Sequence, residues 1–370
     1  MRVLITGGAG FIGSHLADRL LASGYDVRIL DSLVPQVHQG GAKPSYLTEE
    51  AELIQGDVRD RETLQRTLAG VDAVCHLAAR VGVGQSMYEI ADYTSANNLG
   101  TAMLLQCLIE RPVHRLVVAS SMSIYGEGSY TTVDGAPAVA AGRSLERIRR
   151  GQWEPLSADG QTLIAIPTAE TKTPDLASVY ALSKFDQERL SLIVGAAYSI
   201  PTIALRFFNV YGTRQALSNP YTGVLAIFAS RLLNGRPPLI FEDGAQRRDF
   251  VSVHDVAVAC QLALERPATA VAGQAFNIGS GEALTVTQVA RMLAAQLGVD
   301  IEPETTSRYR VGDVRHCFAE LSLAERGLAY RPTRSFRQGL AELTDWLEQQ
   351  HAEDHVADAS HELERRGLTV

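Results

Sequence analysis

Short apolar runs alternate with amphipathic stretches through the first third of the chain. The runs expected to form strands are Arg2–Thr6, Tyr25–Leu30, Glu52–Gln55, Ala73–His76 and Arg115–Ala119. The stretches with apolar residues at helical spacing are Ser14–Ser23, Arg61–Ala69 and Asn97–Ile109. Continuous apolar runs, unlike alternating ones, indicate parallel strands that are buried on both faces. The pattern therefore predicts an α/β fold with a doubly wound parallel sheet.

This alternation breaks in the middle of the chain. From Val133 to Pro174, glycine, proline, alanine and mixed charges dominate, with a weak helical pattern at Ser144–Arg150. A connection this long inside a compact domain is either a functional insertion or mobile. Beyond it we expect a helix at Ser178–Val194 and a strand at Thr202–Arg206, and then a smaller domain that mixes short helices and strands.

Composition narrows the class of protein. Of 370 residues, 46% are hydrophobic and 21% charged, which is ordinary for a globular protein. The net charge of −8 argues against nucleic acid or an anionic membrane as the partner. No apolar run reaches the roughly 18 residues of a membrane span. Four scattered cysteines without a CxxC pair predict reduced thiols in a cytoplasm, with neither a disulfide framework nor a metal site.

A glycine cluster lies between the first expected strand and the first expected helix. Gly7, Gly8, Gly10 and Gly13 let the chain turn tightly and let a pyrophosphate approach helix N–H groups, although an ordinary tight turn is the alternative. Asp31 closes the second strand, where a carboxylate accepts hydrogen bonds from ribose hydroxyls. Because this carboxylate would repel a 2′-phosphate, the sequence favours NAD over NADP. A turn-capping role for Asp31 is the alternative.

Two further motifs carry candidate chemistry. Tyr180 and Lys184 are spaced i, i+4, so both project from one face of a helix. A lysine ammonium and the positive nicotinamide of NAD⁺ would lower the pKa of the tyrosine and make it a general base. Ser121 and Ser123 follow the strand at Arg115–Ala119, on the edge where parallel sheets bind ligands. The alternatives are a surface YxxxK pair and serines that only end a strand.

The run TGGAGFIGSHL, with GxxGxxG in place of GxGxxG, resembles the extended short-chain dehydrogenase/reductase family of NAD-dependent nucleotide-sugar epimerases and dehydratases. The resemblance spans about Met1 to Trp346. It implies a Rossmann-type NAD-binding domain at 1–206 with the insertion 133–174, a sugar-nucleotide domain at 207–350 whose chain returns to the first domain, and a polar tail at 351–370. It also implies a homodimer, paired through the helices at Asn97–Ile109 and Ser178–Val194.

The resemblance also implies roles for individual residues. The expected NAD contacts are Gly7, Gly10, Phe11, Ile12, Gly13, Asp31, Asp57, Val58, Leu77, Ala78, Ala79, Tyr180 and Lys184. Ser121 matches the catalytic Ser/Thr that hydrogen-bonds the reacting sugar hydroxyl, and Ser123 a second hydroxyl on the substrate side; with Tyr180 and Lys184 they form the expected catalytic set. His76, in the HLAA run, is expected to be structural.

On the substrate side, Asn209 matches an asparagine that contacts the diphosphate or the sugar. Arg248 and Arg310 match two diphosphate arginines, and guanidinium groups suit phosphate because they bind it bidentately. Cys317 falls where related epimerases vary a residue that bounds the hexose pocket, although core packing is the simpler interpretation.

The closest resemblance is to the branch of dTDP-L-rhamnose 4-epimerases and UDP-galactose 4-epimerases. Relatives usually carry a CxxC pair in the insertion, and 133–174 has no cysteine. The implied reaction is NAD-dependent epimerisation, at C4, of a dTDP- or UDP-linked hexose or 6-deoxyhexose through a 4-keto intermediate. The alternatives are a dehydrogenase or 4-ketoreductase that releases its cofactor, a 4,6-dehydratase, and a non-catalytic NAD-binding protein.

Two differences from relatives narrow these alternatives. Met122 and Ser123 follow Ser121 where the 4,6-dehydratases carry an Asp and a Glu, which disfavours loss of water. Asn209 and Ala216 stand where relatives that epimerise UDP-glucuronate carry a threonine and an arginine. A buried sugar carboxylate without such a partner would be costly, so we expect a neutral sugar.

Overall fold

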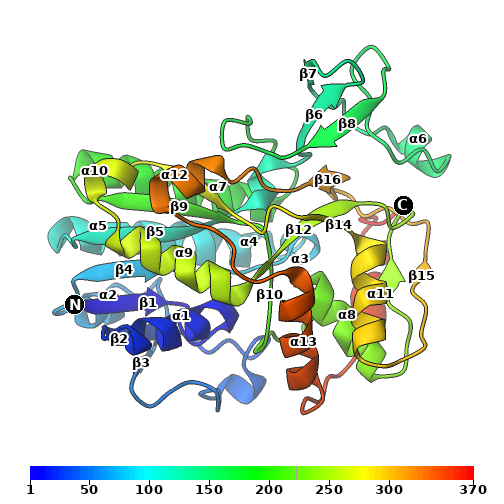
Figure 1. Ribbon diagram of the computed structural model, residues 1–370. Coiled ribbons are helices and arrows are strands. Elements are labelled where there is room, and N and C mark those ends of the chain that lie inside the picture. Colours follow the sequence, from blue (N-terminus) through cyan, green and yellow to red (C-terminus); the bar gives the residue numbers. More distant parts are fainter. Residues whose placement is uncertain (222) are drawn as a thin grey trace.

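The computed structural model describes residues 1–221 and 223–370. The largest sheet in these residues is parallel and has seven strands. Its strand order is β13-β9-β5-β4-β1-β2-β3 (Figure 1). The strands are β1 (Arg2–Thr6), β2 (Asp26–Asp31), β3 (Glu52–Gln55), β4 (Ala73–His76), β5 (Arg115–Ser121), β9 (Thr202–Phe207) and β13 (Ala275–Ile278). The strand order reverses beside β1, which is the switch point where such sheets bind ligands. The predicted fold class is confirmed.

The two faces of the sheet bury alternate residues of each strand. Val3 and Ile5 of β1 pack in one cluster with residues of α1 (Phe11–Ala22) and α9 (Val253–Glu265). Leu4 packs in a second cluster, on the other face. The helices that contribute to this second cluster are α2 (Arg61–Thr67), α5 (Gly100–Glu110) and α7 (Val179–Ala197). Burial on both faces explains why each strand is a continuous apolar run.

A second group of elements surrounds a separate core. Its strands are β10 (Asn209–Tyr211), β12 (Arg247–Ser252), β14 (Ala283–Thr285) and β16 (His316–Cys317), with the pair β11 (Leu239–Ile240) and β15 (Glu304–Thr305) beside them. Its helices are α8 (Val224–Leu233), α11 (Val286–Gln296) and α13 (Phe336–Leu347). The later half of the chain also returns to the first sheet through β13 and α9. The boundary at 206/207 stays a prediction.

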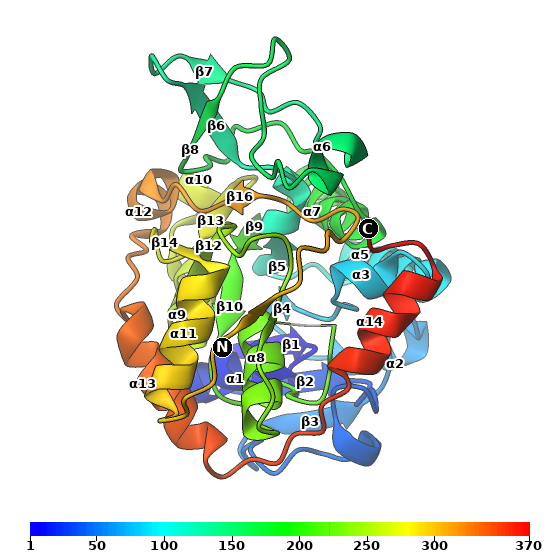
Figure 2. The ribbon, with the colours of Figure 1, turned by 90° about the vertical axis from the view of Figure 1, so that its right-hand side faces the viewer.

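The segment 133–174 is more ordered than its composition indicates. With β6 (Ser129–Thr132), the strands β7 (Pro137–Ala138) and β8 (Leu163–Ile166) form a three-stranded antiparallel sheet that projects from the body with α6 (Leu145–Arg149) (Figures 1 and 2). The helical hint at Ser144–Arg150 is confirmed by α6. The sequence did not predict β7 and β8 because both strands are short. Their pairing with β6 defines them, and no local sequence pattern marks them.

The polar tail at 351–370 also forms structure. It contains α14 (Val356–Arg365), on which Ala359 and Leu363 are buried. Thr369 then pairs with Arg310 in an isolated antiparallel bridge. Charged residues mask the apolar positions at helical spacing, so the tail reads as polar although one face packs against the body. In the described residues no helix is long and apolar enough to cross a membrane.

Candidate active site

The glycine loop between β1 and α1 leaves no room for a side chain at Gly7 or Gly13. Gly7 has φ of 70°, and a Cβ on it would lie 2.8 Å from the Ala78 nitrogen. A Cβ on Gly13 would lie 2.3 Å from the Gly7 carbonyl oxygen. Gly10 is the N-cap of α1 and makes no side-chain hydrogen bond to the first N–H groups of the helix, which leaves them available to a ligand. This cradle fits the diphosphate of a dinucleotide.

Asp31 lies at the carboxyl end of β2, beside this loop. Its carboxylate accepts hydrogen bonds from the backbone N–H groups of Ala9 (3.0 Å) and Leu33 (2.9 Å). These bonds hold the carboxylate, which is nearly buried, at the place where a ribose would lie. The imidazole of His38, 3.8 Å from Asp31, forms a further wall that the sequence motif did not indicate.

The remaining predicted cofactor residues come together around the same sheet edge. The N–H groups of Leu77 and Ala78 donate to Thr6, which places the 77–79 run beside the glycine loop. Asp57 binds Arg59 through both carboxylate oxygens, and the Arg59 hydrogen bond holds the pKa of Asp57 below its ordinary value against the effect of burial. Val58 is buried against Gly100. Contact of Asp57 and Val58 with adenine stays a prediction.

Tyr180 and Lys184 project from the first turns of α7, which Ser178 caps through the Ala181 N–H group. Ser121 ends β5, and its hydroxyl oxygen accepts hydrogen bonds from the Ser123 N–H (3.1 Å) and hydroxyl (2.9 Å) groups. The Ser121 hydroxyl also lies near enough to the Tyr180 hydroxyl to lower its pKa. The structure thus brings the predicted catalytic set together. Ser120, the third serine of this run, points elsewhere and binds Glu188.

Burial is the largest influence on the pKa values of Tyr180 and Lys184. It raises the pKa of Tyr180, which the Ser121 hydroxyl opposes, and it lowers the pKa of Lys184 to about 7. The lysine Nζ lies 2.5 Å from Gln187 Oε1. In the protein without NAD, burial is the largest influence on the pKa of Tyr180 and raises it. Lowering of that pKa by Lys184 together with a bound nicotinamide stays a prediction.

His76 has both ring nitrogens engaged, with the hydroxyls of Thr6 (2.7 Å) and Thr101 (2.9 Å). Burial, followed by the charge of Lys184, lowers its pKa to about 3, so the ring stays neutral. These contacts agree with a structural role. In the described residues no group of three or more His, Cys, Asp or Glu side chains could hold a metal ion.

Two residues that the sequence analysis missed support the catalytic helix. Asn97 lies in a π-helix at Thr94–Leu99, and its amide binds both backbone groups of Arg80 and the Ser183 hydroxyl. The buried hydroxyl of Ser86 accepts a hydrogen bond from the Tyr180 N–H group. A π-helix is a signal of a functional site, but in the sequence Asn97 reads as the start of an ordinary helix.

The two predicted diphosphate arginines converge on Asp313. The Asp313 carboxylate lies 3.7 Å from Arg248 Nη2 and 3.2 Å from Arg310 Nη2. Burial opposes ionisation of this carboxyl, yet Arg310 and Arg248 hold its pKa below the ordinary value. Arg248 also donates to the carbonyls of Val314 (2.5 Å) and Arg315 (2.9 Å). The Nε of Arg310 is buried without a hydrogen-bond partner among the described residues, which fits a site for a ligand acceptor.

Asn209 and Cys317 differ in whether their side chains are available to a ligand. The side-chain oxygen of Asn209 is buried and has no hydrogen-bond partner within 1–221 and 223–370, as expected of a group that binds a ligand. Cys317 is 1% exposed and packs with Ile124, Tyr125 and Phe208, and burial raises its pKa to about 12. The structure thus favours the packing interpretation of Cys317 over a contact with sugar.

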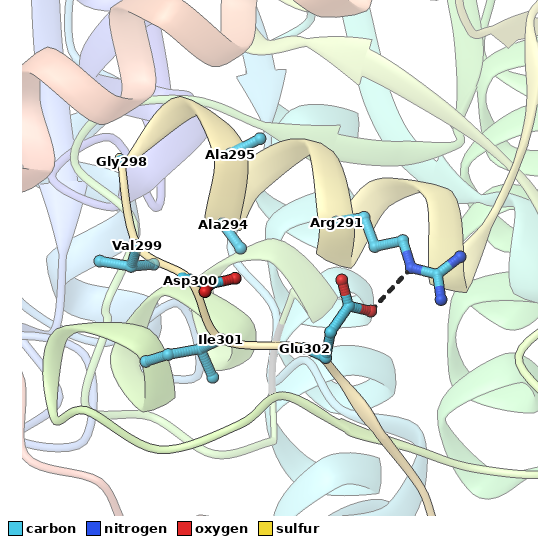
Figure 3. Close-up of a pocket in the computed structure, with 8 residues that line it drawn as sticks. All are labelled: Arg291, Ala294, Ala295, Gly298, Val299, Asp300, Ile301 and Glu302. Carbon is cyan, nitrogen blue, oxygen red and sulfur yellow. Dashed lines mark hydrogen bonds and ion pairs between the residues drawn. The ribbon is translucent and has the colours of Figure 1, made fainter.

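Figure 3 shows a shallow pocket elsewhere, where the end of α11 meets the following loop. Arg291 and Glu302, 3.0 Å apart, form an ion pair at its rim. None of its lining residues belongs to the candidate site.

Comparison with known proteins agrees with this geometry. Residues 3–141 and 157–279 match the NAD dependent epimerase/dehydratase family. A dTDP-L-rhamnose 4-epimerase of Burkholderia thailandensis is 35% identical over 354 residues, which cover 94% of this chain and 95% of the relative. The crystal structure of a UDP-glucose 4-epimerase from Thermotoga maritima with UDP-glucose has a TM-score of 0.77 and 30% identity, covering 94% of this chain and 99% of that one.

A UDP-glucose 4-epimerase of Thermus thermophilus in complex with NAD has a TM-score of 0.75 and 30% identity, covering 95% of this chain and 100% of that one. The cofactor prediction is confirmed as NAD. By its fold, its cofactor site and these matches, the chain belongs to the NAD dependent epimerase/dehydratase family.

Proposed function

We propose that the protein is an NAD-dependent epimerase that inverts C4 of a nucleoside-diphosphate sugar. One observation carries the proposal: Ser121 and Tyr180 meet at the carboxyl edge of the sheet, beside the glycine cradle and with the buried Lys184 one helical turn away. This arrangement places an acid–base tyrosine where a sugar and a nicotinamide would face each other.

In this mechanism the protein moves one proton and positions one sugar. Tyr180 takes the proton of the 4-hydroxyl and returns it after the sugar has turned, while Ser121 hydrogen-bonds the same hydroxyl. Lys184 supplies a donor beside the tyrosine. Bound NAD supplies the hydride acceptor, and because it is restored in each cycle it is not consumed.

Arg248, Arg310 and Asn209 would anchor the diphosphate while the sugar turns. Their support is the convergence of both guanidiniums on Asp313 and the unpartnered polar atoms of Arg310 and Asn209. Guanidinium groups keep their charge and bind phosphate bidentately, so they suit an anchor that must hold through a large motion of the sugar.

The residues after Ser121 favour epimerisation over loss of water. Met122 packs in an apolar cluster, and Ser123 donates its hydroxyl proton to Ser121. Neither side chain is an effective acid or base near neutral pH, so the 4-keto sugar has one productive exit, the return of hydride.

The sugar is a neutral hexose or 6-deoxyhexose carried by dTDP or UDP. Asn209 and Ala216 offer no positive charge for a uronate carboxylate. The relatives named dTDP-L-rhamnose 4-epimerase and UDP-glucose 4-epimerase support this substrate class.

The protein would work as a homodimer in the cytoplasm. Leu99, Leu182 and Ile193 are large apolar side chains exposed on the π-helix and on α7, two elements that pack against each other. A second copy pairing through this face would cover them. Light scattering at micromolar concentration should give twice the chain mass, and a monomer would contradict the proposal.

The proposed function is tested by incubating the protein with a panel of UDP- and dTDP-sugars and resolving products by stereochemistry and mass. We expect interconversion of a 4-epimer pair without net NADH. Stoichiometric NADH would identify a dehydrogenase, and a product lighter by one water would identify a dehydratase.

A further inference from the structure

Arg143 and Glu154, in the insertion 133–174, form ion pairs with the body of the protein; the side chain of Arg143 is buried and that of Glu154 is half exposed. Arg143, 4% exposed, donates to Glu242 Oε1 (2.7 Å) and to the carbonyl of Asp313 (2.8 Å). Glu154 accepts from Arg315 Nη2 (2.5 Å) and Nε (3.0 Å) through one oxygen. Both residues lie at 142–156, the part of the chain that falls between the two stretches matching the family.

The receiving side is also built of buried charge. Arg315 is 1% exposed and binds Glu242 and Asp243 in addition to Glu154. Glu127 accepts from the N–H groups of Arg315 and His316. A buried guanidinium is stable only while its carboxylate partners remain, so each partner helps to fix the position of Arg315.

His316 strengthens the same contact. Its Nδ1 accepts a hydrogen bond from the Arg247 N–H group (3.1 Å), and its Nε2 lies 2.9 Å from the second oxygen of Glu154. One neutral tautomer, protonated on Nε2, satisfies both contacts. Glu154 therefore holds two successive side chains, Arg315 and His316, and the second of these also meets the backbone of β12.

This contact leads directly to the proposed diphosphate site. The carbonyls of Val314 and Arg315 accept the hydrogen bonds of the Arg248 guanidinium, and Asp313 lies between Arg248 and Arg310. The chain of contacts runs from Glu154 through Arg315 to Arg248. Displacing the segment 313–316 would reorient both arginines at once.

We propose that the insertion positions the diphosphate site, with Glu154 and Arg143 as positioning residues that hold the segment 313–316 against Arg248 and Arg310. The inference rests on the proposed function, because it needs a diphosphate for these arginines to hold. It assigns to the insertion an effect on substrate affinity and none on NAD binding or on proton transfer at Tyr180.

The test uses Glu154→Gln, which keeps the shape and removes the charge, with Glu154→Asp as the conservative variant. The matched control is Glu146→Gln, in the same insertion, whose partner is the exposed Arg150. We expect Glu154→Gln to raise the KM of the sugar nucleotide by roughly tenfold with kcat nearly unchanged, since coupled contacts carry about this much. Glu154→Asp should recover part of the loss, and the control should match the parent protein.

A double-mutant cycle distinguishes positioning from general destabilisation. In an Arg248→Lys background, Glu154→Gln should change KM by less than about threefold, because the residue through which it acts is already altered. Equal effects in both backgrounds, or a fall in kcat and NAD content together with KM, would overturn the inference.

Affinities for UDP and dTDP, measured by calorimetry on the same proteins, separate the two proposals. Turnover by the parent protein with unchanged KM and nucleotide affinity in Glu154→Gln would refute the positioning role alone. Absence of turnover by the parent on every sugar would refute the proposed function, and the nucleotide affinities would still decide whether Glu154 positions the site.

Discussion

The cofactor side and the diphosphate side of the candidate site are built by different means. The cofactor side uses backbone: glycines packed against backbone atoms, an uncapped helix end, and Asp31 held by two N–H groups. The diphosphate side uses side-chain charge: the buried arginines Arg143, Arg248 and Arg315 and the partly exposed Arg310, bound to carboxylates or carbonyls.

This difference sets what each side tolerates. A backbone cradle depends on the absence of side chains, so an added methyl group damages it through steric overlap. A charged network depends on mutual compensation, so removing one partner leaves another charge unpaired. The first should therefore respond to size, and the second to charge.

The largest effect is expected where the two sides meet, at Tyr180. Tyr180→Phe keeps the ring and removes the acid–base hydroxyl, so kcat should fall by roughly 10²–10⁴-fold. NAD content and the thermal unfolding midpoint should stay close to those of the parent protein. A turnover near the parent rate, measured by product stereochemistry, would remove Tyr180 from the mechanism.

On the diphosphate side, Arg310→Gln should raise the KM of the sugar nucleotide by roughly 10–100-fold, the usual value of a charged hydrogen bond. Its control is Arg308→Gln, two residues away, where the exposed arginine pairs with Glu364 on α14. Steady-state kinetics on both variants provide the measurement. Equal KM values in the two variants would show that Arg310 does not contact the diphosphate.

On the cofactor side, Gly13→Ala should cost about 1–3 kcal/mol of unfolding free energy through overlap with the loop backbone, and the purified protein should carry less NAD. The matched change is Gly10→Ala, whose Cβ would lie 3.4 Å from the nearest atom, the Gly7 carbonyl oxygen. Denaturant unfolding should show Gly10→Ala close to the parent. The opposite order of stability would contradict the steric account.

The smallest expected effect is a pH dependence of the unfolding free energy that arises from Glu154. The His316 hydrogen bond, with Arg315, lowers the pKa of Glu154 from its ordinary 4.5 to about 2 despite opposing burial. A lowered folded-state pKa contributes stability above pH 4.5 that is lost as the pH falls toward 2. The difference in unfolding free energy between the parent and Glu154→Gln should therefore narrow across this range. A constant difference would show that the carboxylate charge contributes no stability.

The strands, the helix and the loop of the cofactor side could be predicted because their sequence signals are local. The glycine spacing, Asp31 at a strand end and the Tyr180–Lys184 spacing each lie within one strand–helix unit, and the structure brings them together. The five strands expected in the first third are all present. Some observed helix boundaries differ from the expected ones, as at Asn97, which lies in a π-helix that precedes α5.

The diphosphate side could be predicted only in part. Resemblance to relatives pointed to Arg248 and Arg310, but Glu154 and Arg315 are 161 residues apart and meet only in the folded chain. No periodicity marks such a pair, and in the sequence each reads as one more surface charge. The packed face of α14 could not be predicted either, because its buried Ala359 and Leu363 lie among charged residues in the sequence.

The central claim is that hydride leaves C4 of the sugar and returns to the same carbon on the opposite face. It is tested most directly with nucleotide sugars that carry deuterium at C4, incubated with catalytic amounts of the protein in ordinary water. The account predicts a 4-epimer that keeps the deuterium at C4, with no net change in NADH absorbance. A 4-epimer that carries hydrogen from solvent at C4 would contradict it. A product lighter than its substrate by one water or one carbon dioxide would also contradict it.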